Sequence, residues 1–125
     1  MAEETKKSPP TMLLVDDEAD VLSTSAELLE LLGYEVLRAS TAQEALQVLR
    51  DAPHIEVMLT DVLMPDRNGV ELAREARKMA PALDVILVSG FPSTAMDAST
   101  GEPDEFKFLM KPYTLSEVAL LLRSP

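Results

Sequence analysis

The sequence has no cysteine and no tryptophan, and it contains a single histidine. Without cysteine the chain can form no disulfide, offer no thiolate nucleophile and build no cysteine-ligated metal site. This composition suits a reducing cytoplasm, and we expect a cytoplasmic location. Long apolar runs are also missing, and the first residues, Met1 to Glu4, show neither a basic nor an apolar stretch. We therefore expect neither export nor a membrane-spanning segment.

Basic residues are scarce: the chain has 11 Lys and Arg against 22 Asp and Glu, and its formal net charge is -11. The charges within residues 1–10 cancel, so the remainder of the chain carries the whole imbalance. A surface this acidic repels nucleic-acid phosphates over a Debye length of about 10 Å. We expect no direct binding to nucleic acid, whereas cations and basic protein surfaces are expected partners.

The length and composition are typical of one globular domain. At 125 residues, with 46% hydrophobic and 26% charged residues, the chain can bury a single core. Residues 1–10 end in Ser8-Pro9-Pro10 and show no apolar periodicity, which predicts a flexible tail or linker. Residues 11–125 are predicted to form the domain.

Short apolar runs alternate with longer amphipathic segments throughout the predicted domain. We predict strands at 12–15, 36–37, 57–60, 85–88 and 106–110. Helices are predicted at about 19–32, 41–51, 69–80 and 114–123, and the helix expected after Pro92 is short, displaced or absent. This βα alternation predicts an α/β fold in which helices cover both faces of a parallel sheet.

Helix-end signals support these boundaries. Thr41 and Glu44 have the spacing of a capping box, Gly33 stands where a helix C-terminus favours glycine, and Pro81 ends the segment that precedes it.

Charge in two of the strands indicates the order of the sheet. The strands at 12–15, 57–60 and 85–88 are apolar, as is typical of strands buried on both faces, whereas the other two carry charge and belong at the edges. We predict a flavodoxin-like (βα)5 three-layer sandwich with strand order 2-1-3-4-5. Its topological switch point lies between the first and third strands, so a ligand is expected at their carboxyl ends.

Polar residues directly follow most of the predicted strands: Asp16, Asp17, Asp61, Ser89 and Lys111. The carboxyl ends of parallel strands share one edge, so these residues should converge. Three carboxylates close together repel each other unless a cation intervenes, and Mg2+ suits a site with few carboxylates. A hydroxyl and an ammonium group opposite the acids suit a phosphate.

Each of these residues also has an ordinary structural interpretation. An Asp pair ahead of a helix is commonly an N-cap, Asp61 and Ser89 could form turns, and Lys111 could be a solvated surface charge. Their joint placement at one edge favours a shared metal and phosphate site.

Short motifs surround these residues: Val15-Asp16-Asp17-Glu18, Thr60-Asp61-Val62-Leu63-Met64-Pro65, Asn68-Gly69, Val88-Ser89-Gly90 and Met110-Lys111-Pro112. Together they resemble the receiver domain of two-component response regulators, and the resemblance covers about residues 11–123. The wording of the motifs is more similar to receivers attached to hybrid histidine kinases than to those joined to DNA-binding domains.

The resemblance implies a phosphoacceptor in a two-component phosphorelay. It implies that a histidine kinase or a histidine phosphotransfer protein phosphorylates Asp61. It also implies that Mg2+, or Mn2+ in its place, is bound by Asp16, Asp17, Asp61 and the main-chain carbonyl of Leu63. The only catalysis implied is the domain's own phosphorylation and dephosphorylation, so no enzyme acting on other substrates is expected.

The resemblance also implies a conformational switch that signals to a partner. Ser89 and Lys111 would hold the phosphoryl oxygens, and Ser89 and Phe108 would change position on phosphorylation. Gly90 replaces the alanine common in the family, and Phe108 has no phenolic oxygen, so switching by packing alone is implied.

Other functions remain open on the residues alone. A phosphohydrolase could use Asp61 as its nucleophile, although the sequence indicates no substrate pocket, and the fold could serve a phosphate-independent interaction module, against which the complete set of acids argues. A Ser-His-Asp triad is excluded, because His54 is expected in a solvated loop at the opposite end of the sheet from Ser89. No Walker A, GxGxxG or HExxH spacing occurs.

The predicted helix at about 19–32 has more apolar residues than one buried face requires. The expected core stripe is Leu22, Ala26 and Leu29. The residues that widen it are Val21, Leu28 and Leu31. They predict either a broad core helix or a partner-binding face, and the resemblance implies that this helix docks on the phosphodonor.

Overall fold

The computed structural model describes residues 11–52, 54–64, 66, 68–89, 106–110, 114, 116–118 and 120. Within these residues the chain forms a 5-stranded parallel sheet of order β2-β1-β3-β4-β5. The strands are β1 (Thr11–Val15), β2 (Glu35–Ala39), β3 (Val57–Asp61), β4 (Asp84–Ser89) and β5 (Lys107–Met110). The predicted order is confirmed, and the two charge-bearing strands lie at the edges.

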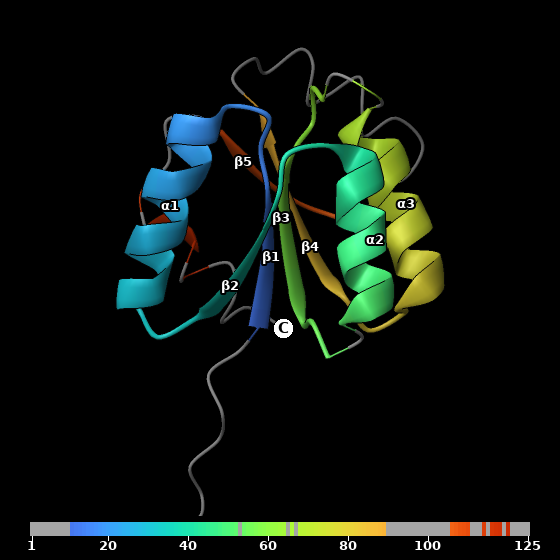
Figure 1. Ribbon diagram of the computed structural model, residues 1–125, viewed down its shortest axis with the longest axis horizontal. Helices are drawn as coiled ribbons and strands as arrows, with labels where there is room; N and C mark the ends of the chain where they lie inside the picture. Colours follow the sequence, from blue (N-terminus) through green and yellow to red (C-terminus); the bar gives the residue numbers. More distant parts are fainter. Residues whose placement is uncertain are drawn as a thin grey trace, which may run out of the picture.

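Helices cover both faces of this sheet. Figure 1 shows α1 (Ala19–Leu31) on one face and α2 (Ala42–Asp51) and α3 (Gly69–Met79) on the other. Residues 116–118 and 120 are also helical, within the helix predicted at 114–123. The predicted three-layer α/β fold is confirmed, whereas the predicted tail at 1–10 and the weak helix after Pro92 lie outside the described residues.

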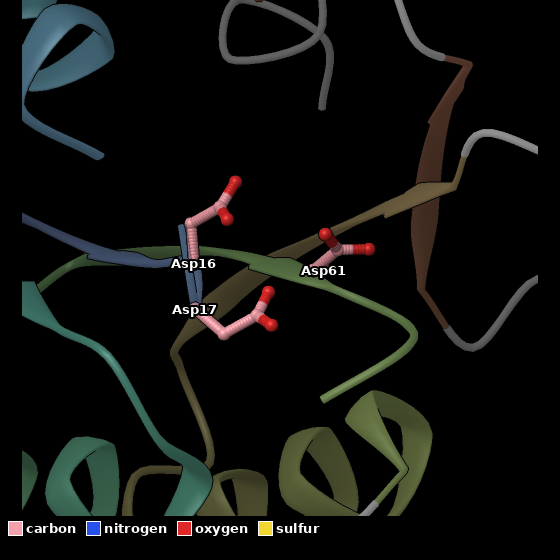
Figure 2. Close-up of side chains that lie close together, drawn as sticks. All are labelled: Asp16, Asp17 and Asp61. Atoms are coloured by element: carbon pink, nitrogen blue, oxygen red, sulfur yellow. The ribbon is translucent and has the colours of Figure 1, made fainter. Parts of the chain in front are cut away.

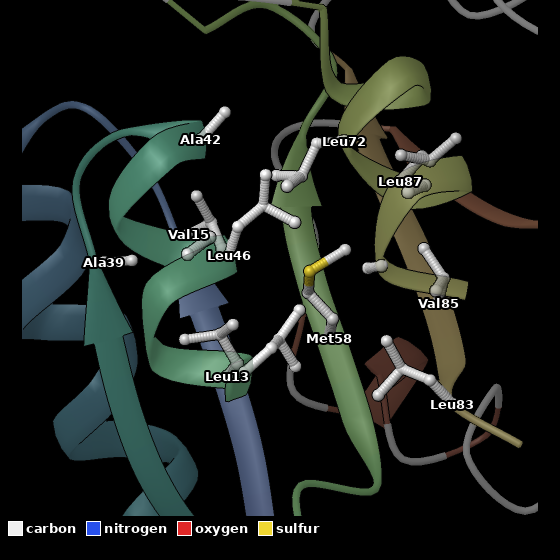
Figure 3. Packing of buried hydrophobic residues seen from close by; sticks show 14 of the residues in the cluster. Leu13, Val15, Ala39, Ala42, Leu46, Met58, Leu72, Leu83, Val85 and Leu87 are labelled. Carbon is white, nitrogen blue, oxygen red and sulfur yellow. The ribbon is translucent and has the colours of Figure 1, made fainter. Parts of the chain in front are cut away.

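Alternation along the strands divides the core into one cluster on each face. In β1, Leu13 and Val15 belong to the cluster beneath α2 and α3, whereas Met12 and Leu14 belong to the cluster beneath α1. Successive strand residues point to opposite faces, so a strand buried on both faces is apolar throughout. Figure 3 shows the α2 and α3 side, where Met58 of β3 packs among the same aliphatic side chains. The two clusters hold β1 and β3 at the centre of the sheet and so place their carboxyl ends.

Side-chain caps mark the predicted helix ends. The Thr41 hydroxyl oxygen accepts a hydrogen bond from the Glu44 N–H at 3.0 Å, and Glu44 Oε1 accepts from the Ser40 N–H at 2.6 Å. Gly33 follows α1 with a φ of 101°, the left-handed conformation that glycine adopts at helix C-termini. α3 ends at Met79, ahead of Pro81. The predicted end signals are therefore confirmed.

Candidate functional site

Three carboxylates meet at the carboxyl edge of the sheet. Asp16 and Asp17 follow β1, and Asp61 ends β3; β1 and β3 are paired, with Val15 opposite Thr60. One oxygen of each carboxylate lies within 4.8 Å of the other two. Asp16 is 7% exposed, Asp61 is half-buried and Asp17 is exposed, so the cluster reaches from the sheet edge to solvent (Figure 2). Hard oxygen donors this close together can bind a divalent cation.

The Asp pair does not act as the N-cap of α1, the ordinary interpretation of its position. The N-cap is Glu18, whose side chain makes no capping bond among the described residues. Asp16 Oδ1 instead accepts a hydrogen bond from the Glu18 N–H at 2.9 Å, which fixes the turn after β1. This local bond holds the Asp16 carboxylate at the sheet edge.

The backbone after β3 holds Asp61 from two sides. The Val62 N–H donates to the Val88 carbonyl of β4 at 2.9 Å, and the Gly69 N–H donates to the Val62 carbonyl at 2.7 Å. Asp61 Oδ1 accepts a long hydrogen bond from the Leu63 N–H at 3.4 Å. The loop that carries Leu63 therefore starts from a strand end fixed by both β4 and α3.

Of the two predicted phosphate-binding residues, the structure describes Ser89, which lies at the same edge. Ser89 ends β4 and is 1% exposed; β4 lies beside β3, with Val88 opposite Asp61. Lys111 follows β5, whose Met110 is paired with Ser89, but Lys111 itself lies outside the described residues.

A small cavity lies beside the acids at the edge of the sheet. The cavity that the described residues form beside Asp16, Thr60 and Asp61 has a volume of about 10 Å³. That is room for roughly one water molecule. An organic phosphate ester would have to bind outside this cavity.

Phe108, the predicted switch residue, lies in β5 opposite Leu87 of β4. Its half-buried side chain packs against the cluster beneath α2 and α3, to which Phe106 also belongs.

The apolar residues of α1 separate into two faces. The buried residues are Leu22, Ala26 and Leu29, as predicted. The residues that widen the stripe are exposed: Val21 by 37%, Leu28 by 40% and Leu31 by 82%, with Leu32 beyond the helix also exposed. Within the described residues, these three side chains therefore do not belong to the buried stripe of α1.

His54 is exposed in a turn before β3, whereas Asp61 ends that strand. The two residues thus lie at opposite ends of the sheet, as the sequence predicts. Among the described residues we find no helix with the length and apolar composition needed to cross a membrane.

The loop between β3 and α3 makes one contact of which the sequence gives no sign. Asp66, in the loop between β3 and α3, accepts hydrogen bonds from the N–H groups of Ala42 and Gln43 at the start of α2, both at 3.0 Å. No local pattern signals a bond between residues so far apart in the chain. The one available signal is that aspartate is favoured as a cap at helix N-termini, and this preference does not say which helix Asp66 would cap.

The fold and the acid cluster together define an α/β domain with an acidic edge at its topological switch point. Comparison with known families assigns it further. The profile of the response regulator receiver domain matches residues 12–123, and the chain belongs to this family.

Two proteins of Brucella abortus (strain 2308) are similar over most of the chain. The sensor kinase CckA is 33% identical over 114 residues, which are 90% of this chain but 12% of the kinase. The response regulator receiver protein CpdR is 32% identical over 107 residues, which are 86% of this chain and 88% of CpdR. The chain thus spans a small part of the kinase and most of the single-domain protein.

Solved structures agree with this assignment. A response regulator receiver domain protein from Clostridium thermocellum superposes with a TM-score of 0.82 at 31% identity, covering 90% of each chain. The receiver domain of the hybrid histidine kinase CckA gives a TM-score of 0.74 at 31% identity, covering 90% of this chain and 94% of that one. The similarity to hybrid-kinase receivers noted in the motifs is therefore present among the relatives, beside that to single-domain receivers.

Proposed function

We propose that this receiver domain accepts a phosphoryl group on Asp61 from the phosphohistidine of a histidine kinase or a histidine phosphotransfer protein. The observation that carries the proposal is the meeting of Asp16, Asp17 and Asp61, with oxygen atoms within 4.8 Å of one another at the end of β1 and β3. Receiver domains take phosphoryl groups from histidine kinases and pass the signal to output domains.

The same residues fit a divalent cation. Receiver domains bind Mg2+ at an acidic cluster of this kind. Here Mg2+, with Mn2+ as a substitute, would be held by Asp16, Asp17, Asp61 and the main-chain carbonyl of Leu63, all of them oxygen donors. When bound, the cation supplies positive charge that offsets the repulsion between the acids and an incoming phosphoryl group.

The transfer requires an Asp61 oxygen in line with the bond from phosphorus to the donor's imidazole nitrogen. The new P–O bond forms as the P–N bond breaks, and the electron pair of the broken bond stays on that nitrogen. Ser89 would donate its hydroxyl hydrogen to a phosphoryl oxygen, and the Lys111 ammonium group would neutralise another. Water later cleaves the acyl phosphate and restores the Asp61 carboxylate. The domain would thus catalyse only its own phosphorylation and dephosphorylation.

Ser89 and Phe108 are proposed to carry the switch, because Ser89 ends β4 and Phe108 lies in β5, the strand paired with β4. Phe108 lacks a hydroxyl, so its movement would be driven by packing alone. Val21, Leu28 and Leu31 are proposed to dock the phosphodonor, which would act in the cytoplasm. Support for this face is its exposure along α1, whose start follows Asp16 and Asp17 at the end of β1.

Neither alternative function has support of this kind. A phosphate-independent interaction module would not need the three acids, yet they are present and close together. A phosphohydrolase would need a substrate pocket, and the sequence indicates none.

Intact mass after incubation with acetyl phosphate and MgCl2 tests the proposal. We expect the parent chain to gain the mass of one phosphoryl group, and Asp61→Asn to gain none. Asp51→Asn is the matched control, because it removes the same charge from an exposed position at the end of α2 and should be labelled like the parent. Equal labelling of Asp61→Asn and the parent would disprove the assignment of the acceptor.

A further inference from the structure

The loop that follows Asp61 is tied to a helix that lies earlier in the chain. Asp66 Oδ1 accepts a hydrogen bond from the Ala42 N–H, and Asp66 Oδ2 accepts one from the Gln43 N–H, each at 3.0 Å. These N–H groups are the first two of α2, which have no partner within the helix. One carboxylate therefore closes the end of α2 with both of its oxygens.

Two effects make this interaction favourable. The N-terminus of a helix carries partial positive charge, and a carboxylate placed there gains from both the dipole and the charge-assisted hydrogen bonds. Thr41, the residue directly before α2, separately caps the helix by accepting a hydrogen bond from the Glu44 N–H. Asp66 is thus a second cap, which comes from the loop between β3 and α3. Because both of its carboxylate oxygens are bound to α2, the position of that loop is restricted.

The loop itself carries the backbone of the site. It leaves β3 at Asp61, and its first residues include Leu63, whose carbonyl belongs to the proposed Mg2+ ligand set. A bridge between Leu63 and Asn68 closes the loop on itself, and Asn68 caps α3 through the Val70 N–H at 2.6 Å. The Asp66 bonds attach this closed loop to α2 as well as to its flanking elements.

We propose that Asp66 is a positioning residue for the Mg2+ site: by binding the start of α2 it holds the loop so that the Leu63 carbonyl stays at the cation-binding edge. The inference rests on the proposed function, since Leu63 is a ligand only there. A plain cap would stabilise α2 without any effect on cation binding, and this difference can be measured.

The test is to titrate the parent and four single variants with MgCl2 and to monitor binding by backbone amide NMR shifts. The melting temperature of each protein is also recorded. Asp66→Ala removes both acceptors, and Asp66→Asn keeps one. Thr41→Ala removes a cap from the same helix end but leaves the loop attached. Glu44→Gln removes a negative charge from that helix end while keeping an acceptor for the Ser40 N–H.

We expect Asp66→Ala to weaken Mg2+ binding by about tenfold, the low end of what outer-shell partners of metal ligands contribute. Asp66→Asn should bind with intermediate affinity. Thr41→Ala should melt at a lower temperature yet bind Mg2+ like the parent, and Glu44→Gln should also bind like the parent.

Three results would overturn the inference. One is an Mg2+ affinity unchanged in Asp66→Ala, or, where that variant does not fold, in Asp66→Asn. Another is an equal loss in Thr41→Ala, which would mean that any weakening of α2 affects the cation. The last is an equal loss in Glu44→Gln, which would mean that charge alone acts. A parent that binds no Mg2+ would instead disprove the proposed function on which the inference depends.

Discussion

Gly69 shows how closely single residues are packed behind the carboxyl edge of the sheet. A Cβ atom at this position would overlap the main-chain oxygen of Asp61 and lie 2.9 Å from the Cα atom of Val62. The Gly69 N–H donates to the Val62 carbonyl, so the first turn of α3 is joined to the end of β3 through backbone alone. Any side chain at position 69 must push α3 away from Asp61.

Gly69→Ala should therefore impair both stability and chemistry. Overpacking of this kind lowers the free energy of unfolding by about 1–3 kcal/mol. Displacement of Asp61 should also slow its labelling by acetyl phosphate, because misplacing a reacting group by about 1 Å can cost about 100-fold in rate. Urea denaturation and the time course of the mass gain measure the two effects.

Gly33→Ala is the matched control for this variant. It also destabilises the fold, since Gly33 has a φ of 101°, but it lies after α1 at the far end from Asp61. It should be labelled at the parent's rate. A Gly69→Ala chain that is labelled as fast as the parent would contradict the argument.

Among the helices, α1 has more apolar residues than its buried stripe requires. Its buried stripe packs on the cluster beneath it, while Val21, Leu28 and Leu31 remain exposed on the outside. The carboxyl end of β1 leads into the start of this helix, so Val21 lies near Asp16 and Asp17, whereas Leu28 and Leu31 lie toward the far end of α1. A protein bound to all three residues would extend along the helix toward the acids.

Leu28→Glu and Leu31→Glu should slow phosphotransfer from a cognate histidine phosphodonor, because a charge would replace apolar contact area. Labelling by acetyl phosphate, which needs no docking, should stay unchanged. The free energy of unfolding should change by no more than about 0.5 kcal/mol, as is usual at exposed positions. Rates of transfer from a radiolabelled donor measure the effect.

Met79→Glu controls for the introduced charge, since Met79 is a similarly exposed apolar residue at the end of α3. It should receive the phosphoryl group at the parent's rate. If Leu28→Glu and Leu31→Glu also do so, the donor docks elsewhere.

At the scale of the whole molecule, charge works against the compact state. The net charge is -11, and three of the acids lie within 4.8 Å of one another. Self-repulsion of this kind is relieved in two ways: dissolved salt screens it everywhere, and a bound cation removes it at one place. The two contributions can be separated by the choice of salt.

MgCl2 should raise the melting temperature more than NaCl at the same ionic strength, because binding to the folded state adds to screening. A cation at 100 times its dissociation constant contributes about 2.7 kcal/mol. Asp17→Ala should keep the response to NaCl and lose most of the extra response to MgCl2. Thermal denaturation followed by circular dichroism measures both, and equal melting temperatures of the parent in the two salts would count against a magnesium site.

The strand order, and the edge at which Asp16, Asp17 and Asp61 meet, could be predicted from the amino-acid sequence. These follow from rules that act locally or through chain connectivity: apolar strands are buried, charged strands lie at edges, and parallel strands end on a common side. The helix ends at Thr41 and Gly33 follow from the hydrogen-bonding needs of neighbouring N–H and C=O groups. The family motifs lie on these same positions.

The apolar residues of α1 that face solvent, and the groups that Asp66 binds, became clear only from the packing of the folded chain. Periodicity places Leu28 and Leu31 on a helix but does not say whether another element covers them. Asp66 reaches Ala42 and Gln43 across 24 and 23 residues of chain, and Gly69 is required because α3 starts against the backbone of Asp61. Such contacts depend on how finished elements pack together, and no pattern of neighbouring residues encodes that distance.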